Sequence, residues 1–118
     1  QDPADPHYSE LRRMADELRA LRTLNGAPYH LCELPWAPPI RAADGRRLAA
    51  SYANFLISNG AVFMPGYGVA TDQSAAEVLA EAFPTHTIVP VPCRPLIEQN
   101  GSLHCISMQL PLGSVREA

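Results

Sequence analysis

The order of local patterns in the second half of the chain constrains its fold more than any other feature of the sequence. Residues 51–57 are partly aromatic and β-branched, and a Ser-Asn-Gly turn signal at 58–60 leads into a second apolar run at 61–64. Helix-capping residues and a helical spacing of apolar side chains follow at 71–83, and residues 87–91 are typical of a buried strand. This order predicts an α/β fold of the α+β kind, built on a strand-strand-helix-strand unit, ββαβ.

The N-terminal part of the chain predicts the end of an earlier unit of the same kind. Asp5-Pro6 offers a helix start, apolar side chains then recur at helical spacing, and Asn25-Gly26 offers the end of that helix. Residues 29–34 alternate loosely like a short strand. We therefore expect residues 1–34 to hold a helix and a strand, and a repeated ββαβ architecture to organise the protein.

Prolines set the remaining boundaries. The sequence Pro-Trp-Ala-Pro-Pro at 35–39 forbids regular structure, so residues 35–50 are expected to form a loop. The last ββαβ unit is then expected to cover residues 51–111, which leaves residues 112–118 as a C-terminal tail.

Side-chain spacing supports both expected helices. In the first helix, Glu10 and Arg13 are placed for neighbour pairing, and the charged face that they share is interpreted as solvated. In the second helix, Ser74 and Glu77 have the spacing of a capping box, in which each side chain bonds the backbone of the other residue.

Charge and apolar content argue against several kinds of partner. A net charge of −3 and a pI near 5.7 supply no positive field for phosphates, so no nucleic acid partner is expected. No apolar run approaches the roughly 18–20 residues that cross a bilayer, so no membrane partner is expected either. The N-terminus lacks the basic and apolar regions of a signal peptide, and its starting Gln indicates a chain cut from a longer one.

The cysteines and histidines form no recognisable metal or disulfide pattern. Cys32, Cys93 and Cys105 are odd in number and widely spaced, which argues against a disulfide framework and a zinc site. The histidines of the helix start, the expected strand and the loop before the last strand share no face. We expect no metal, no cofactor and a cytoplasmic location, with one thiol available for reaction.

Cys105 is the candidate nucleophile. If residues 103–108 form a strand, alternation places Cys105 and His104 on opposite faces, which makes His104 a poor candidate for its base. A thiolate is a natural nucleophile for an electron-poor carbon such as a guanidinium centre, provided that donors or a cation lower its pKa. The sequence shows no local activator, and the alternative is a buried core cysteine.

Several segments, in order, resemble agmatine deiminases and the related Porphyromonas-type peptidylarginine deiminases. The resemblance covers nearly everything after about Pro35, and its order and spacing matter more than any single piece. The segments are Ala50-Ser51-Tyr52-Ala53-Asn54-Phe55, Asn59-Gly60, Asp72 through Glu77, Leu79 to Phe83-Pro84, Ile88-Val89, Cys93-Arg94, Gly101-Ser102-Leu103-His104-Cys105, Gln109 and Pro111.

This resemblance implies a fold and a reaction. The fold would be a five-bladed α/β propeller of ββαβ units, the pentein fold, with its last unit and the end of the fourth in this chain. Cys105 would attack the guanidinium carbon of agmatine and form a covalent thiouronium-type intermediate, giving N-carbamoylputrescine and ammonia in putrescine biosynthesis. Gly101 and Ser102 would lie against the substrate. The catalytic His and most of the carboxylates would lie in the remainder of the parent chain, so this chain alone is expected to be inactive.

Two departures from the family pattern leave the substrate open. Residues 98–103 lack the usual glycine run before His-Cys, and residues 107–110 replace Gln-rich sequence. Because both segments flank Cys105, peptidyl arginine or another guanidine compound remains an alternative to agmatine. A non-catalytic structural or interaction module with a buried Cys105 is the alternative from a different class. An isolated end of a propeller exposes strand edges, so self-association is also expected.

Overall fold

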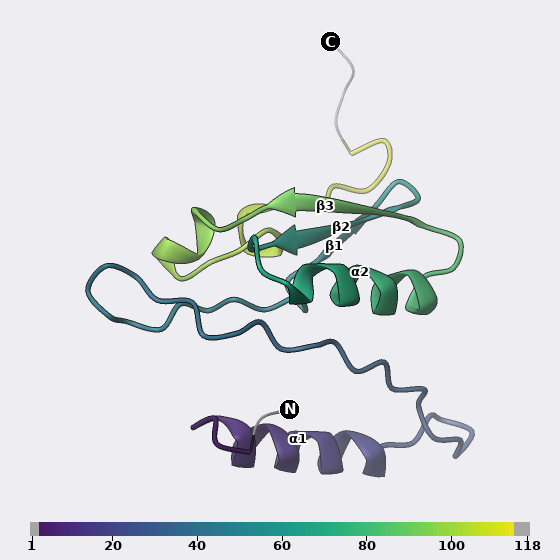
Figure 1. Cartoon of the computed structure of the whole chain (residues 1–118). Coiled ribbons are helices and arrows are strands. Elements are labelled where there is room, and N and C mark those ends of the chain that lie inside the picture. The colour runs from purple at the N-terminus through teal and green to yellow at the C-terminus, as the bar shows by residue number, and fades with distance from the viewer. Residues whose placement is uncertain (1–2, 115–118) are drawn as a thin grey trace. The chain divides into compact units, whose positions relative to one another are not determined.

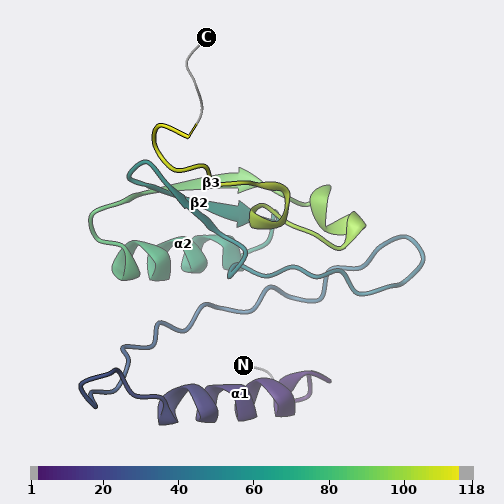
Figure 2. The same ribbon diagram turned by 180° about the vertical axis from the view of Figure 1, so that it is seen from behind.

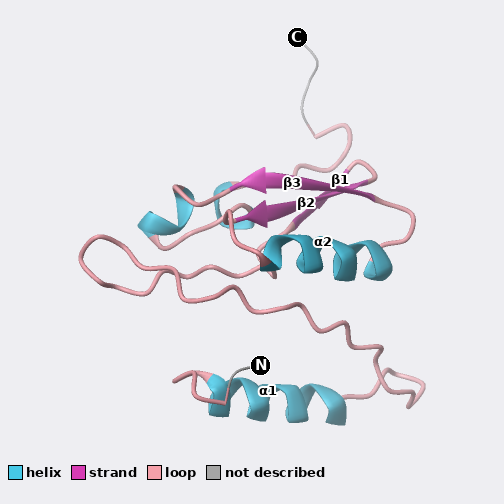
Figure 3. Cartoon of the chain, viewed as in Figure 1, coloured by secondary structure: helices cyan, strands magenta, loops and turns pink. Residues whose placement is uncertain are grey.

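The computed structural model of this chain describes residues 3–114. It contains two α-helices, three strands and two short 3₁₀ helices, and it divides into two compact units between Glu33 and Leu34 (Figures 1 and 3). Residues 1 and 2 and part of the expected tail at 112–118 lie outside the described residues. Within the described part, no helix is long and apolar enough to span a membrane.

The first unit contains helix α1, Tyr8–Ala20. It begins slightly later than expected because the Asp5 carboxylate accepts a hydrogen bond from the His7 backbone N–H at 2.9 Å, which holds a turn before the helix. The predicted pair of Arg13 and Glu10 is confirmed at 3.8 Å between their side chains. Because both side chains are mostly exposed, such a pair contributes only about 0.2–0.5 kcal/mol.

The predictions for residues 20–34 are wrong in two respects. Helix α1 ends at Ala20 rather than near Asn25-Gly26, which instead form part of a tight turn closed by hydrogen bonds between Thr23 and Ala27. Residues 29–34 form no strand, and the nearest pairing is an isolated bridge between Arg22 and Pro28. A loose alternation becomes a strand only when a partner strand supplies hydrogen bonds, and this segment has none among the described residues.

The second unit contains a three-stranded sheet in the order β1-β2-β3. Strands β1 (Leu56–Ser58) and β2 (Ala61–Gly66) are antiparallel, whereas β2 and β3 (Thr87–Pro92) are parallel. The predicted hairpin is confirmed, with Asn59 at φ 49° and Gly60 at φ 78° in the turn. Strand β1 is shorter than expected because residues 51–54 form a turn.

Helix α2, Thr71–Ala82, connects β2 to β3 and covers one face of the sheet (Figures 1 and 2). The ββαβ order predicted from the sequence is therefore present. The capping box is wrong, because the Ser74 hydroxyl donates to the Thr71 carbonyl at 3.1 Å. The Asp72 carboxylate instead stabilises the turn before the helix by accepting hydrogen bonds from the backbone N–H groups of Tyr67 at 3.0 Å and Gly68 at 2.8 Å.

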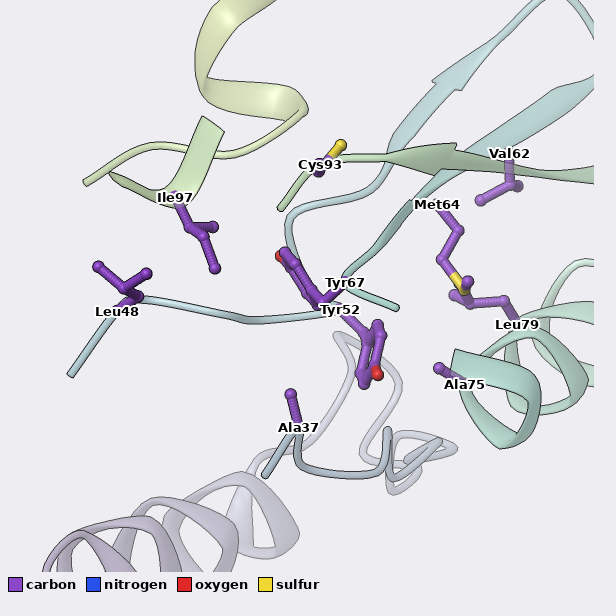
Figure 4. Close-up of a cluster of buried hydrophobic side chains, with 10 residues drawn as sticks. All are labelled: Ala37, Leu48, Tyr52, Val62, Met64, Tyr67, Ala75, Leu79, Cys93 and Ile97. Atoms are coloured by element: carbon purple, nitrogen blue, oxygen red, sulfur yellow. The ribbon is translucent and has the colours of Figure 1, made fainter. Parts of the chain in front are cut away.

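The core lies between α2, the sheet and the loop that precedes β1. Val62 and Met64 of β2 pack toward Leu79 of α2, and all three are almost completely buried (Figure 4). The segment 35–50, which contains no helix or strand, contributes Ala37 and Leu48 to the same cluster. The core therefore reaches beyond the ββαβ unit itself.

The predicted nucleophile strand is wrong. After β3 the chain forms a 3₁₀ helix, η1 (Leu96–Gln99), and Asn100 adopts a left-handed conformation with φ 65°. Residues His104–Ile106 then form a second 3₁₀ helix, η2, so Cys105 lies in a helical turn. Strand alternation consequently gives no information about the direction of His104.

Candidate functional site

The turn that carries Cys105 is anchored at its start by Arg46. The Arg46 guanidinium donates to the Asn100 side-chain oxygen at 2.7 Å and to the Glu98 carbonyl at 3.1 Å. Charge-assisted bonds of this kind are stronger than neutral ones. They connect the loop at 35–50 to Asn100, the residue with a left-handed backbone conformation just before Gly101.

Asn54 holds the same turn at its other end. Its side-chain oxygen accepts hydrogen bonds from the backbone N–H of His104 at 2.7 Å and of Cys105 at 3.3 Å. Its side-chain amide donates to Cys105 Sγ at 3.1 Å. One side chain therefore both orders the backbone of η2 and contacts the sulfur.

The Cys105 side chain is exposed, and its pKa lies below the ordinary value for a thiol. The main cause is a hydrogen bond from the Ser102 backbone, followed by the bond from the Asn54 amide. The small desolvation of the thiol opposes them. The groups that lower the pKa are all neutral donors, so the thiolate is favoured without a nearby cation.

Ser102 plays a different part from its neighbour Cys105. Its side chain is 2% exposed, and its hydroxyl forms a 3.0 Å hydrogen bond with the Tyr67 hydroxyl. Since Tyr67 donates its own proton to the Ser51 carbonyl at 2.9 Å, the Ser102 hydroxyl is the donor in the shared bond. The Ser102 side chain thus points into the core, whereas the Ser102 backbone bonds Cys105.

Gly101 lies directly against the nucleophile candidate. A Cβ atom added at Gly101 would sit 3.4 Å from the Cys105 Cβ atom, which is a close contact without a clash. Asn100, not Gly101, has the positive φ of this turn. The predicted site residues Gly101, Ser102 and Cys105 are therefore brought together, with only Gly101 and Cys105 near the surface.

A partly buried polar network lies next to the turn. The Tyr52 hydroxyl donates to the Asp72 carboxylate at 2.6 Å and lies 2.8 Å from the Thr71 hydroxyl. The Tyr52 and Tyr67 rings pack with centroids 5.5 Å apart, between Cys93 and Ala75 (Figure 4). Because the Tyr67 hydroxyl also bonds the Ser102 hydroxyl, the network connects helix α2 to the Cys105 turn.

Burial and hydrogen bonding together set the pKa values of Tyr52 and Asp72. Burial raises the pKa of Tyr52, and the bond to Asp72 raises it further. Burial would also raise the pKa of Asp72, but the Tyr52 bond and the backbone N–H bonds of Tyr67, Gly68 and Val69 outweigh it and lower that pKa. The ionised form of Asp72 is therefore favoured, because neutral hydrogen-bond donors surround its carboxylate.

The other cysteines and histidines do not join the site. Cys32 is exposed in the first unit, whereas Cys93 is buried at the end of β3, where burial raises the pKa of its thiol. His86 bonds Thr85 and packs its ring against Phe83. Among residues 3–114, no group of three or more His, Cys, Asp or Glu side chains could hold a metal ion.

Asn54 is the residue in contact with the Cys105 turn that reasoning from local sequence missed. It lies 51 residues before Cys105, in a turn that has no periodicity of its own. The only signal that included it was the segment 50–55, which formed part of the family resemblance. No spacing rule connects a turn residue to a thiol so far away in the chain.

Comparison with known proteins gives a consistent result. The profile of the Porphyromonas-type peptidyl-arginine deiminase family matches residues 1–111. The agmatine deiminase of Stutzerimonas stutzeri is 33% identical over 132 residues, which cover 98% of this chain and 36% of that protein.

Two solved structures agree with this match. A candidate arginine deiminase of Porphyromonas gingivalis superposes with a TM-score of 0.93 and 46% identity, covering 98% of this chain and 34% of that one. A cysteine-to-serine variant of C. jejuni agmatine deiminase with substrate bound superposes with a TM-score of 0.79 and 39% identity, covering 89% and 29%. This chain thus spans about a third of the length of its relatives.

Proposed function

Because this chain belongs to the Porphyromonas-type peptidyl-arginine deiminase family, we propose that it forms the C-terminal part of a guanidine hydrolase with Cys105 as its nucleophile. The single observation that carries this proposal is the state of the Cys105 thiol. It is exposed, it receives hydrogen bonds from neutral donors, and its pKa is lowered. A structural cysteine has no need of any of these features, whereas an attacking thiol needs all of them.

The reaction follows from the chemistry of a thiolate and a guanidinium group. The Cys105 thiolate attacks the guanidinium carbon, a C–S bond forms, and the carbon becomes tetrahedral. A general acid from the rest of the protein protonates one nitrogen, the C–N bond breaks, and ammonia leaves a covalent thiouronium intermediate. Water then adds to the same carbon, its protons pass to the conjugate base and to solvent, and the C–S bond breaks to release the ureido product.

The substrate proposed first is agmatine, which would yield N-carbamoylputrescine and ammonia. Relatives named as agmatine deiminases match nearly the whole of this chain, and one of them has been solved with its substrate. Peptidyl arginine is the alternative, favoured by the family description and by the 46% identity to the Porphyromonas gingivalis structure. In either case Gly101 and the backbone of Ser102 would lie beside the guanidinium group.

The wider architecture is part of the same proposal. The β1-β2-α2-β3 order is that of one ββαβ unit, and we propose that it is the last of five such units in a pentein propeller. The catalytic His and the guanidinium-binding carboxylates would come from the other units, so this chain alone is inactive. The cytoplasmic location stays a prediction.

Exposed apolar side chains support the need for a partner. Met14 of α1 and Leu21, just after that helix, are each about half exposed, at 50% and 52%, and Met108 is 86% exposed. We propose that the remainder of the parent chain covers such surfaces and that the isolated chain self-associates. Light scattering tests this point, and a monomer over a wide concentration range would contradict it.

The experiment that tests the proposed function uses the full-length protein that contains this chain. It is incubated with 2-chloroacetamidine, a guanidinium-like thiol reagent, and the labelled residue is identified by mass spectrometry. Labelling at Cys105 that agmatine blocks supports the nucleophile and the substrate, and labelling blocked only by peptidyl arginine moves the substrate. Unselective labelling of Cys105 and Cys32 would overturn the proposal in favour of a non-catalytic module.

A further inference from the structure

We propose that Arg46 is a positioning residue for the nucleophile: it holds the turn at Asn100 and so keeps the Ser102 backbone in place beside the Cys105 sulfur. This inference rests on the proposed function of Cys105 and deepens it, because it assigns a task to a side chain far earlier in the sequence. Its basis is one exposed guanidinium group that bonds two atoms of the segment leading to Cys105.

The two Arg46 bonds reach the same short segment. One guanidinium nitrogen donates to the Asn100 side-chain oxygen at 2.7 Å, and the other donates to the Glu98 carbonyl at 3.1 Å. A guanidinium group holds its donors in a rigid, planar arrangement, so two such bonds define the positions of both acceptors. The contact therefore fixes the backbone between residues 98 and 100.

This backbone contains a conformation that needs support. Asn100 has φ 65° and ψ 23°, the left-handed region that residues other than glycine rarely adopt. It is the residue at which the chain leaves η1 and turns toward Gly101. A charge-assisted bond to the Asn100 side chain stabilises the turned conformation against relaxation to an extended one.

The position of the turn decides the surroundings of the thiol. A Cβ atom added at Gly101 would lie 3.4 Å from the Cys105 Cβ atom, so the two residues are closely packed. The Ser102 backbone bonds the sulfur, and this bond is the largest cause of the lowered Cys105 pKa. The Tyr67 hydroxyl holds Ser102 from the core side, whereas Arg46 holds the preceding turn from the solvent side.

Arg46 lies in a loop that is itself fixed to the core. Residues 40–48, here called the arginine loop, fold back so that the Leu48 backbone N–H donates to the Ile40 carbonyl at 2.8 Å. Leu48 at the end of the loop and Ile97 of η1 are both buried in the same cluster (Figure 4). Arg46 therefore joins two segments that are each held by the core.

Arg94 joins the same two segments independently. Its guanidinium group donates to the Arg41 carbonyl at 3.3 Å and to the Glu98 carboxylate at 2.7 Å. This contact keeps the arginine loop beside η1 when the Arg46 side chain is changed. A substitution at Arg46 therefore removes the bonds to the turn without releasing the loop.

The test removes either the donor or the acceptor of the contact. Arg46→Met keeps the aliphatic stem but has no N–H donor, and Asn100→Gly removes the acceptor while tolerating the left-handed conformation. Both side chains are exposed, so the fold should survive either change. Arg41→Met is the matched control: it removes the same charge from the same loop, but the Arg41 guanidinium bonds the Gly45 carbonyl.

The readout is the rate at which iodoacetamide alkylates Cys105 in the full-length protein, followed by mass spectrometry as a function of pH. For Arg46→Met we expect the midpoint of the profile to rise by about half a unit and the rate at pH 7 to fall about threefold. Asn100→Gly should act similarly, and the double variant should be no slower than the slower single variant, because both remove one contact. Arg41→Met should stay within about twofold of the unchanged protein.

The titration of neighbouring groups is separated in the same experiment. His104 is the titratable side chain next to Cys105 in η2, so the shift is measured again in a His104→Gln background, where it should persist. Residues 51–58, which contact the turn through Asn54, contain no charged side chain.

The outcomes distinguish this proposal from the proposed function. An unchanged profile in Arg46→Met would overturn the positioning role, even if Cys105→Ser is inactive and the nucleophile stands. Equal shifts in Arg41→Met and Arg46→Met would also overturn it, since charge alone would account for them. A shift in Arg46→Met and Asn100→Gly, but not in Arg41→Met, supports the positioning role, and it does so even if an active Cys105→Ser variant overturns the nucleophile.

Discussion

Two cysteines of the second unit, twelve positions apart, show opposite behaviour. Cys93, at the end of β3, is fully buried, and burial raises the pKa of its thiol. Cys105, in the η2 turn, is exposed, and hydrogen bonds lower the pKa of its thiol. The side-chain chemistry is the same, so the difference comes from position in the fold alone.

Ser102 shows how closely the two environments are connected. Its hydroxyl lies in the core, where it bonds Tyr67 and also moderates the pKa of Cys93. Its backbone bonds Cys105 at the surface. We infer that the buried residues around Cys93, through Ser102, hold the Cys105 turn in position.

The largest expected effect separates the two thiols by substitution. In the full-length protein, Cys105→Ser should lower deiminase activity by at least about a thousandfold, because a serine hydroxyl is far less acidic than a thiol and is a much weaker nucleophile near neutral pH. Cys93→Ala should keep most of the activity and lose roughly 1 kcal/mol of stability from a small core cavity. Steady-state assays and urea unfolding measure the two effects. Full activity in Cys105→Ser would contradict the role of Cys105 as the nucleophile.

The next effect concerns the hydrogen-bond network around Asp72. Asp72→Asn should lower the free energy of unfolding by about 2 kcal/mol at pH 7, because charge-assisted bonds to Tyr52, Tyr67 and Gly68 are lost. Since the folded pKa of Asp72 is depressed, its contribution is complete above its ordinary value near 4 and disappears as pH falls through the lower folded value. The difference between the two proteins should therefore shrink only below about pH 4.

Urea unfolding at several pH values, followed by the fluorescence of Trp36, measures the Asp72 effect in the second unit. The alkylation profile of Cys105 in the folded protein serves as the control, and it should not move. A stability difference that is constant from pH 7 to pH 2 would contradict the role assigned to the carboxylate.

A smaller effect links the two regions. Tyr67→Phe removes the hydroxyl that bonds both Ser51 and Ser102, so it should cost roughly 1 kcal/mol of stability and slow alkylation of Cys105 by about two- to fivefold. Tyr52→Phe is the matched control, because its hydroxyl bonds Asp72 and Thr71 but not Ser102. If both variants slow alkylation equally, the Ser102 connection is wrong.

The smallest effect tests the neutral character of the activation. Because no charged group among residues 3–114 lowers the pKa of Cys105, raising the salt concentration from about 0.05 to about 0.5 M should change its alkylation rate by less than about twofold. A thiolate paired with a cation would respond more strongly. Stopped-flow or quenched alkylation at fixed pH provides the measurement, and a large salt effect would indicate a charged partner.

Part of this fold could be predicted because its signals are local. The Asn59-Gly60 turn, α2 and β3 lie within two residues of their predicted limits, since turn chemistry and helical periodicity act over a few residues. The strand expected at 29–34 was wrong, because strand formation depends on a partner strand and residues 29–34 have none within 3–114. The strand expected at 103–108 was wrong because Asn54 orders that segment as a 3₁₀ turn.

The sequence by itself determined the ββαβ order, the family resemblance and the choice of Cys105 as the nucleophile candidate. Only the tertiary structure decided that the pKa of the Cys105 thiol is lowered, that the Ser102 backbone and the Asn54 amide lower it, and that the Ser102 hydroxyl faces the core. The physical reason is distance along the chain. Secondary structure follows from neighbouring residues, whereas the pKa of a thiol follows from donors that only folding brings within hydrogen-bond reach.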